Sequence, residues 1–202
     1  MSKYVPALVV GFLVAAGVAF LLTMLSAAGG ADAGPAPTLV GALGGVFTAY
    51  LMANLAGNRR SAKGSDAQKQ AVLDLRTDPG QALLIVFREG FLGSAAGMDV
   101  SVDGRFVAQL KSPRFTATSV APGARRLSMG FGGLAATQNE ATVMEFAAAP
   151  GEVAAFRATM KMGGVKNRIV LQRVDDDREA LVKRLRPMTM IAPDGGAGPV
   201  PA

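Results

Sequence analysis

The first 57 residues consist of two long runs without charge, separated by a short break. Residues 5–28 are 24 uncharged and mostly apolar positions, and a helix of that length spans about 36 Å at 1.5 Å per residue. A hydrocarbon core of about 30 Å needs roughly 20 such residues. Residues 29–37 carry three glycines and two prolines, which interrupt a helix. Residues 38–57 form the second run, so the pattern predicts a transmembrane helical hairpin.

A cleaved secretory signal is the alternative interpretation of the first run. The sequence Ala31-Asp32-Ala33 resembles a small-residue cleavage site. Signal peptides have apolar cores of about 7–15 residues, however, which is shorter than this run. Both interpretations leave the remainder of the chain on the same side of the membrane, because the second run would still cross it.

Basic residues flank one side of the two runs only. Arg59, Arg60 and Lys63 follow the second run, whereas residues 29–37 contain no Lys or Arg. Since positive side chains stay cytoplasmic, the turn is expected outside and everything after residue 58 inside. This pattern predicts a multi-pass protein of the bacterial cytoplasmic (inner) membrane whose basic residues set the topology and contact anionic headgroups.

Small residues recur at a spacing of four in both runs, which is the spacing of neighbours on one helix face. Close backbone approach at such stripes is how helices associate in lipid. We interpret the stripes as a packing surface between the two helices, although a composition rich in Ala and Gly also produces such stripes by chance. The predicted packing residues are Gly11, Ala15, Ala19, Gly41, Gly45, Ala49 and Ala53.

From residue 58 the chain is charged and its periodicity changes. Residues 58–80 are predicted to be a basic linker with a short juxtamembrane helix, which begins after a capping box at Ser65. Alternation then predicts eight short strands with turn signals between them, which favours an antiparallel sandwich or barrel. The expected strands are 81–89, 98–102, 105–110, 114–120, 124–131, 142–147, 153–162 and 168–174.

Turn residues support this assignment. Asp103-Gly104 lies between two alternating runs, where a type I′ hairpin turn needs positive φ at both positions. Pro122-Gly123 marks the turn between the expected strands 114–120 and 124–131. The predicted fold is therefore a membrane-anchored all-β protein, in which the hairpin is followed by an Ig-like antiparallel β-sandwich at 81–175. A short helix at 176–186 and a disordered tail at 187–202 complete it.

The turn motifs resemble those of small β-sandwich domains of the PEGA type, which occur in bacterial lipoproteins and envelope proteins. The resemblance covers residues 83–173 and implies an Ig-like sandwich with a binding or scaffolding role and no catalytic residues. This chain differs in having no Cys for a lipid anchor and in its predicted cytoplasmic side. The matching residues are Val102, Asp103, Gly104, Val120, Pro122, Gly123, Gly151, Glu152 and Phe156.

The amino-acid composition excludes most kinds of catalytic and metal-binding site. The chain has no Cys and no His, which excludes disulfides, thiol catalysis and His-based triads. Carboxylates such as Glu145 are scattered, and the acidic run 175–177 reads as a helix start rather than a cation site. We therefore predict no enzyme activity, no catalytic residues, no metal site and no cofactor.

The net charge of +6 indicates an acidic partner surface. Anionic headgroups or an acidic protein are favoured over nucleic acid, because aromatic residues are only 6% of the chain and no basic–aromatic motif occurs. The predicted function is a non-enzymatic accessory or scaffold subunit whose sandwich binds a partner, another subunit or a second copy, within a larger membrane assembly such as an energy-transducing complex. The alternative is a stand-alone membrane-tethered module that binds or senses a ligand.

Overall fold

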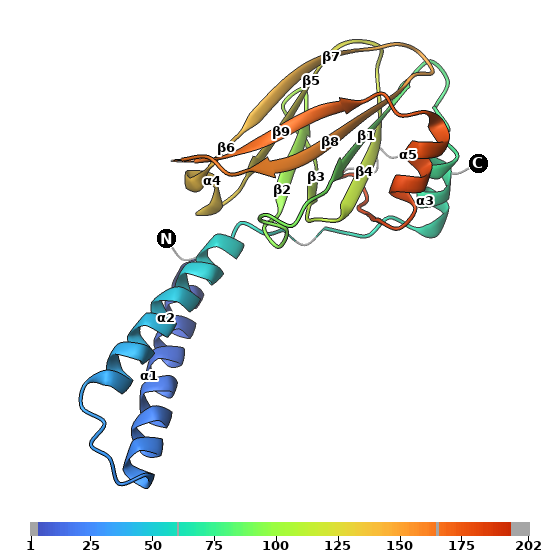
Figure 1. Cartoon of the computed structure of the whole chain (residues 1–202). Coiled ribbons are helices and arrows are strands. Elements are labelled where there is room, and N and C mark those ends of the chain that lie inside the picture. Colours follow the sequence, from blue (N-terminus) through green and yellow to red (C-terminus); the bar gives the residue numbers. More distant parts are fainter. Residues whose placement is uncertain (1–3, 60, 165, 195–202) are drawn as a thin grey trace. The chain divides into compact units, whose positions relative to one another are not determined.

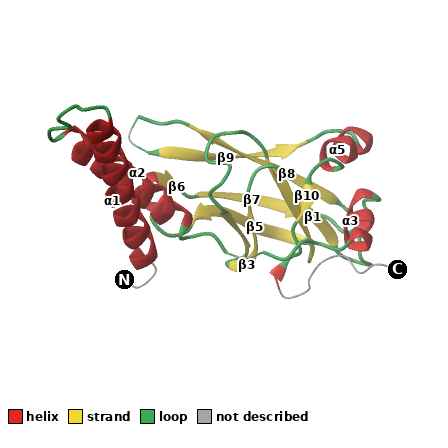
Figure 2. Ribbon diagram, turned by 90° about the horizontal axis from the view of Figure 1, so that it is seen from below, coloured by secondary structure: helices red, strands yellow, loops and turns green. Residues whose placement is uncertain are grey.

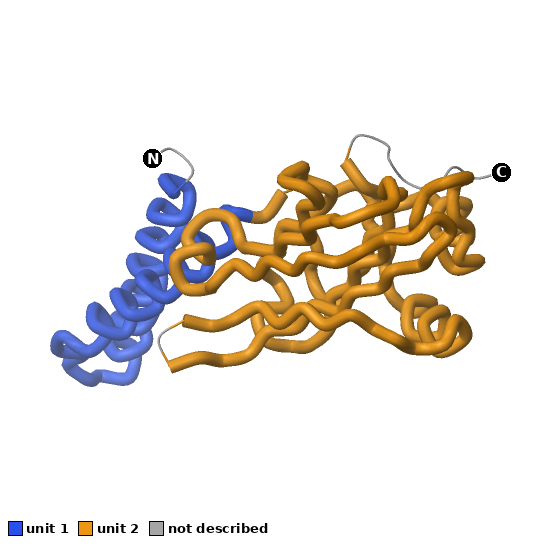
Figure 3. The backbone as a smooth tube through the Cα atoms, turned by 90° about the horizontal axis from the view of Figure 1, so that it is seen from above, with its two compact units in different colours: residues 1–57 blue, residues 58–202 orange. Residues whose placement is uncertain are grey.

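The computed structural model describes residues 4–59, 61–164 and 166–194. The chain divides into two compact units, residues 1–57 and residues 58–202, which Figure 3 distinguishes by colour. The first unit is helical and the second is mostly β. Each unit has its own packing and is described separately.

The first unit is a pair of helices, α1 (Val5–Ala28) and α2 (Ala36–Leu55). Each has proline in its first turn, where the missing N–H costs least. For this reason α2 starts at Ala36, two residues before the expected apolar run, and it also ends two residues earlier. In the connection between the helices, Gly34 has a φ of +52° and its N–H donates to Asp32 Oδ1. Both helices are long and apolar enough to cross a membrane.

The described residues of the second unit form two sheets and three short helices (Figure 1). One sheet has six strands in the order β10-β4-β1-β8-β9-β6, and the other has four in the order β3-β2-β5-β7. The strands are β1 (Ala82–Arg88), β2 (Met98–Val102), β3 (Arg105–Leu110), β4 (Arg114–Val120), β5 (Gly123–Phe131), β6 (Asn139–Glu140), β7 (Thr142–Ala148), β8 (Val153–Lys161), β9 (Asn167–Val174) and β10 (Thr189–Met190). The helices are α3 (Asp66–Leu73), α4 (Ala135–Gln138) and α5 (Arg178–Leu185).

The main hydrophobic core lies between the two sheets, as in a β-sandwich. Leu84 and Val86 of β1 and Phe156 of β8 face Val100 of β2 and Met129 of β5, and all five are at most 1% exposed. Alternation along each strand places these residues on one face. The sandwich expected from the sequence pattern is therefore present.

The expectation of a purely antiparallel sandwich is wrong for the larger sheet. In that sheet β1 pairs in parallel with β8, β10 with β4, and β6 with β9. The four-stranded sheet is antiparallel throughout. Alternation within a strand shows which face is buried but not the direction of a partner strand distant in the sequence, so the sequence pattern could not distinguish these arrangements.

Two helices cover the outer face of the six-stranded sheet and enclose a second core (Figure 2). Val72 of α3 and Leu185 of α5 are fully buried there against Phe87 and Phe115. The capping box at Ser65 starts α3, because Ser65 Oγ accepts from Gln68 N at 3.1 Å and the Gln68 side chain accepts in return. This covering explains why every residue of β1 is buried, on both faces of the sheet.

Candidate functional site: a helical seam, a fixed connection and a pocket

The two helices of the first unit meet along their small residues. A Cβ added at Gly11 would stand 2.7 Å from Ala49 Cβ, and one added at Gly45 would stand 2.6 Å from Ala15 Cβ. A Cβ at Gly41 would stand 2.9 Å from Ala19 Cβ and would also collide with a backbone carbonyl of α1. Real Cβ atoms almost never approach so closely, so these three positions require glycine. The predicted packing residue Ala53 is half-buried.

The opposite surface of the helices is strongly apolar. Phe12 is 72% exposed, Leu43 72%, Val46 70% and Phe47 61%. The seam therefore uses the small side chains and leaves the large ones facing outward. A surface of this kind is stable only against other apolar groups, either lipid or protein.

The segment after residue 57 is held against the second unit rather than hanging free. Asn58 Nδ2 donates to Ala95 O at 3.1 Å, and Gly97 N donates to Asn58 Oδ1 at 2.5 Å. Arg59 N donates to Gln109 Oε1 at 2.6 Å. Further along, Lys63 forms a β-bridge with Ile191. Asn58, Arg59 and Lys63, which belong to the segment predicted as a linker, therefore contact the second unit.

The basic residues predicted to set the topology have separate environments. The Arg59 guanidinium lies 4.6 Å from the centroid of the Phe106 ring, a cation–π distance. Lys63 is exposed in the bridged segment. Arg60 lies outside the described residues.

A buried arginine organises the loop between β1 and β2. Arg88 is 1% exposed; its Nη1 donates to Ala96 O at 2.5 Å and to Leu110 O at 3.0 Å, and its Nη2 donates to Gly93 O at 2.6 Å. Burial lowers the pKa of Arg88 to about 10, so the side chain stays charged at neutral pH. The sequence analysis missed this residue, although a charge at the end of the apolar run ALLIVFR was a usable signal.

The predicted turn residues come together at the opposite end of the sandwich. Asp103 and Gly104 have φ values of +50° and +79°, the two positive values that a type I′ turn needs. Asp103 Oδ1 accepts from Arg126 N at 2.9 Å, and its Oδ2 forms an ion pair with Arg125 Nη1 at 3.1 Å. The backbone hydrogen bond from Arg126 lowers the pKa of Asp103, and the Arg125 guanidinium adds to this. Arg125 also donates to Pro122 O at 2.9 Å, which joins the two predicted turns.

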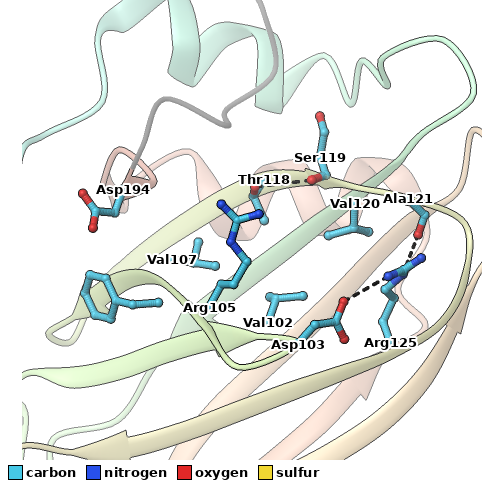
Figure 4. A pocket seen from close by; sticks show the side chains of 11 residues that line it. Val102, Asp103, Arg105, Val107, Thr118, Ser119, Val120, Ala121, Arg125 and Asp194 are labelled. Carbon is cyan, nitrogen blue, oxygen red and sulfur yellow. Dashed lines mark hydrogen bonds and ion pairs between the residues drawn. The ribbon is translucent and has the colours of Figure 1, made fainter.

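These turns border a pocket of about 240 Å³ (Figure 4). Val102 and Val120 supply apolar walls, and Arg105 extends across the pocket toward Thr118 of β4. Within the described ranges, the Arg105 side chain makes no hydrogen bond or ion pair. The pocket therefore combines the Arg105 guanidinium with apolar walls. Two carboxylates also line it: that of Asp103, which pairs with Arg125, and that of Asp194. Sequence spacing could not reveal the pocket, because β4 is brought to the β2–β3 turn only by sheet packing.

Several of the remaining carboxylates have structural partners. Asp177 caps α5 by accepting from Ala180 N at 2.7 Å, Asp176 pairs with Arg184 at 3.2 Å, and Glu152 pairs with Arg173. Glu145 points outward from β7. Across residues 4–59, 61–164 and 166–194, no three acidic side chains gather as a metal site would require.

The fold and these sites define a protein with an apolar two-helix hairpin and a β-sandwich domain. No protein-family model matches the chain, and no curated protein is significantly similar to it. The resemblance to PEGA-type domains accordingly stays a prediction from turn residues.

Proposed function

We propose that this protein is a non-enzymatic accessory or scaffold subunit of a bacterial inner-membrane complex. In this proposal α1 and α2 cross the membrane, the sandwich is cytoplasmic and Ig-like, and the outer surface of the hairpin or the sandwich binds another subunit. The supporting observation is the hairpin itself. Gly11, Gly41 and Gly45 lie in the seam between the helices, and the large side chains, including those of Phe12 and Leu43, face outward.

The fixed connection at Asn58 supports a scaffold rather than a freely tethered module. Only Ala56 and Gly57 separate the last residue of α2 from Asn58, which is bonded to the loop at Ala95 and Gly97. Two residues provide little slack. A partner bound to the sandwich would therefore be held close to the membrane, as assembly of a membrane complex requires.

A pull-down from native membranes in mild detergent tests the proposal. We expect one or more membrane proteins to co-purify with the full chain in fixed stoichiometry, measured by native mass spectrometry. A chain carrying Gly45→Leu, in which the hairpin seam is disrupted, should lose the partner if the partner binds the hairpin. A wild-type chain recovered only as a monomer or homodimer would contradict the scaffold role.

Topology has its own test. A reporter that is active only in the cytoplasm, fused after residue 202, should be active, because Arg59, Arg60 and Lys63 follow the second helix and residues 29–37 have no positive charge. The same fusion to a reporter active only in the periplasm should be silent. The reverse pattern would contradict the proposed cytoplasmic side.

A ligand-binding module is the second candidate, favoured by the pocket beside Arg105. If the protein carries a small anionic ligand, native mass spectrometry of the purified full chain should detect it as an added mass. Arg105→Ala should release that mass, whereas Arg126→Ala, a change at an exposed neighbour outside the pocket, should retain it. Identical spectra for the wild type and Arg105→Ala would exclude a site that depends on this guanidinium.

A further inference from the structure

One end of the sandwich carries the exposed apolar side chains of the second unit. Among the residues that the structure describes in that unit, four large apolar side chains are exposed: Phe91 at 94%, Leu92 at 38%, Val143 at 47% and Met162 at 80%. On a domain otherwise covered by polar groups, such a set marks an interaction surface.

Strand register shows that these four residues share one end. Phe91 and Leu92 follow β1, and Met162 follows β8, which runs parallel to β1. Val143 lies at the start of β7, where Thr142 Oγ1 donates to Ile169 O near the start of β9. Because β9 is antiparallel to β8, its start lies beside the end of β8. We call this surface the Phe91 end; it comprises residues 90–97, 111–113, 142–143 and 161–162.

The loop of the Phe91 end is bonded to a residue that follows α2 closely in the sequence. Asn58, which is bonded to Ala95 and Gly97 in this same loop, is the third residue after Leu55, the last residue of α2. Three residues reach at most about 11 Å. If α2 crosses a membrane, as proposed above, the loop carrying Phe91 is therefore held within reach of the membrane surface.

The loop also has a fixed shape that presents its apolar side chains outward. Arg88 binds the carbonyls of Gly93 and Ala96 from inside, and Ser112 N donates to Ser94 O at 3.2 Å. With the backbone polar groups turned inward, Phe91 and Leu92 are left on the outside. Residues 90–98 contain no charged side chain, so the tip of the loop can enter an apolar layer without burying a charge.

Charges around the loop are mainly positive. Lys111, Arg114 and Lys161 carry positive charge at this end, and Lys111 directly precedes the residue bonded to the loop. Of the carboxylates near this end, Glu140 pairs with Arg168 at 3.3 Å and Glu89 lies 3.9 Å from Arg184. Asp99 accepts a hydrogen bond from the neutral Gln109 side chain at 2.7 Å. An apolar tip ringed by basic side chains is complementary to an anionic leaflet, in which the headgroups lie above the acyl chains.

We infer that the Phe91 end is a second membrane contact, in which Phe91 and Leu92 insert into the interface of an anionic bilayer while Lys111 and Lys161 bind headgroups. The occupant is the bilayer that holds α1 and α2, so the inference rests on the proposed anchoring. Within the sandwich, the pocket beside Arg105 lies at the end opposite the Phe91 end.

Single-tryptophan fluorescence tests this inference, because the chain has no Trp. The full chain is reconstituted into vesicles of phosphatidylcholine and phosphatidylglycerol, with or without phosphatidylcholine brominated near the top of its acyl chains. Phe91→Trp reports the loop, Phe47→Trp reports α2, and Ala149→Trp reports an exposed turn at the opposite end. Phe91 is almost fully exposed, so its replacement leaves the fold unchanged.

We expect the emission of Phe91→Trp to be blue-shifted and quenched by brominated lipid, as for Phe47→Trp. The emission of Ala149→Trp should be red-shifted and quenched only by acrylamide in the water phase. If Phe91→Trp behaves like Ala149→Trp while Phe47→Trp is quenched by lipid, the anchor stands and the inference is wrong. A blue shift without lipid quenching would place Phe91 against protein and overturn it as well. If Phe47→Trp is not quenched by lipid, the anchoring itself fails.

Discussion

Arg88 fixes the conformation of a loop that has few other means of holding one. Residues 90–97 are small or apolar except for Ser94, and three of them are glycine. The buried guanidinium supplies donors for the carbonyls of Gly93 and Ala96, so those groups need no water. A cation is costly to bury, but three hydrogen bonds from the Arg88 guanidinium to carbonyls offset part of this cost.

Replacing Arg88 with Met should loosen this loop and destabilise the domain. The change leaves buried carbonyls without donors, and we expect the free energy of unfolding to fall by about 2–4 kcal/mol. Hydrogen exchange of residues 90–97 should accelerate, measured by mass spectrometry on the full chain in detergent. Arg126→Met, at an exposed position, is the control and should change stability by less than about 0.5 kcal/mol. Equal effects of the two changes would contradict the role assigned to Arg88.

The lowered pKa of Asp103 predicts how the stability of the domain depends on pH. The pKa of the Asp103 carboxyl is lowered in the folded state, chiefly by the hydrogen bond from Arg126 N. Its ionised form therefore adds stability that is complete above the ordinary Asp pKa of about 3.9 and is lost as pH falls through the lower folded-state pKa. Asp103→Asn keeps a residue that tolerates positive φ. The difference in Tm between wild type and variant should be constant from about pH 5 to 8 and shrink toward pH 2; a difference that grows on acidification would contradict this.

At the scale of elements, two surfaces in this protein are buried for different reasons. The seam between α1 and α2 relies on the absence of side chains at Gly11, Gly41 and Gly45. The strand β1 relies on having large side chains on both faces, because a second sheet covers one face and α3 and α5 cover the other. Glycine is thus required where backbones touch, and Leu or Phe where layers are about 10 Å apart.

The seam can be tested with two adjacent glycines. Gly45→Leu would place a side chain against Ala15 and the Gly11 carbonyl, whereas Gly44 has no atom near its Cβ position. We expect Gly45→Leu to destabilise the helix pair by about 1–3 kcal/mol, as overpacking does. Gly44→Leu should be neutral or mildly stabilising, since Leu favours helix over Gly. Thermal loss of helical circular dichroism in detergent is the measurement, and equal Tm values for the two variants would exclude the seam.

The helical cover of β1 can be tested along α5. Leu185 is fully buried in the second core, whereas Val182 on the same helix is only partly buried. Leu185→Ala should lower the free energy of unfolding by about 2–5 kcal/mol, and Val182→Ala by clearly less. Urea unfolding of the full chain, followed by the β-sheet circular dichroism signal, gives both values. A larger loss for Val182→Ala would mean that α5 does not pack on the sheet through this face.

At the scale of the whole molecule, the connection between the units is short, and the hydrogen bonds of the second unit begin soon after α2 ends. The domain begins its own hydrogen bonds at Asn58, and Gly97 lacks a Cβ where one would collide with the Gln109 side chain. Further along, Ser61 Oγ donates to Gln109 O, and Lys63 forms a β-bridge with Ile191. The chain therefore passes from α2 into a folded domain within three residues.

A longer connection should leave the stability of the domain unchanged but let the domain move away from the membrane surface. Insertion of ten Gly/Ser residues between Gly57 and Asn58 leaves every contact of Asn58 available, so the Tm of the domain should not change. The insert lets the domain move away from the membrane surface. Quenching of Phe91→Trp by brominated lipid should then decrease, while quenching of Phe47→Trp stays constant. An unchanged Phe91→Trp signal would show that the loop binds lipid without help from the short connection.

The sequence by itself determined the features that depend on local periodicity. Uncharged runs of helical length, alternation of period two, and the Asp103-Gly104 turn predicted two apolar helices and a mostly β domain with a sandwich, because these patterns depend on neighbouring residues and on which side meets water. The glycines of the seam were likewise recognisable from their spacing of four.

Only the tertiary structure decided which distant segments meet. The parallel pairing of β1 with β8, the covering of β1 by α3 and α5, the burial of Arg88 and the attachment of Asn58 to Gly97 all join residues far apart in sequence. The pocket beside Arg105 and the gathering of Phe91, Val143 and Met162 at one end arise in the same way. A hydrophobic pattern indicates that one face of a helix or strand must be buried. The hydrophobic effect is not directional, however, so the pattern does not specify which other segment covers that face.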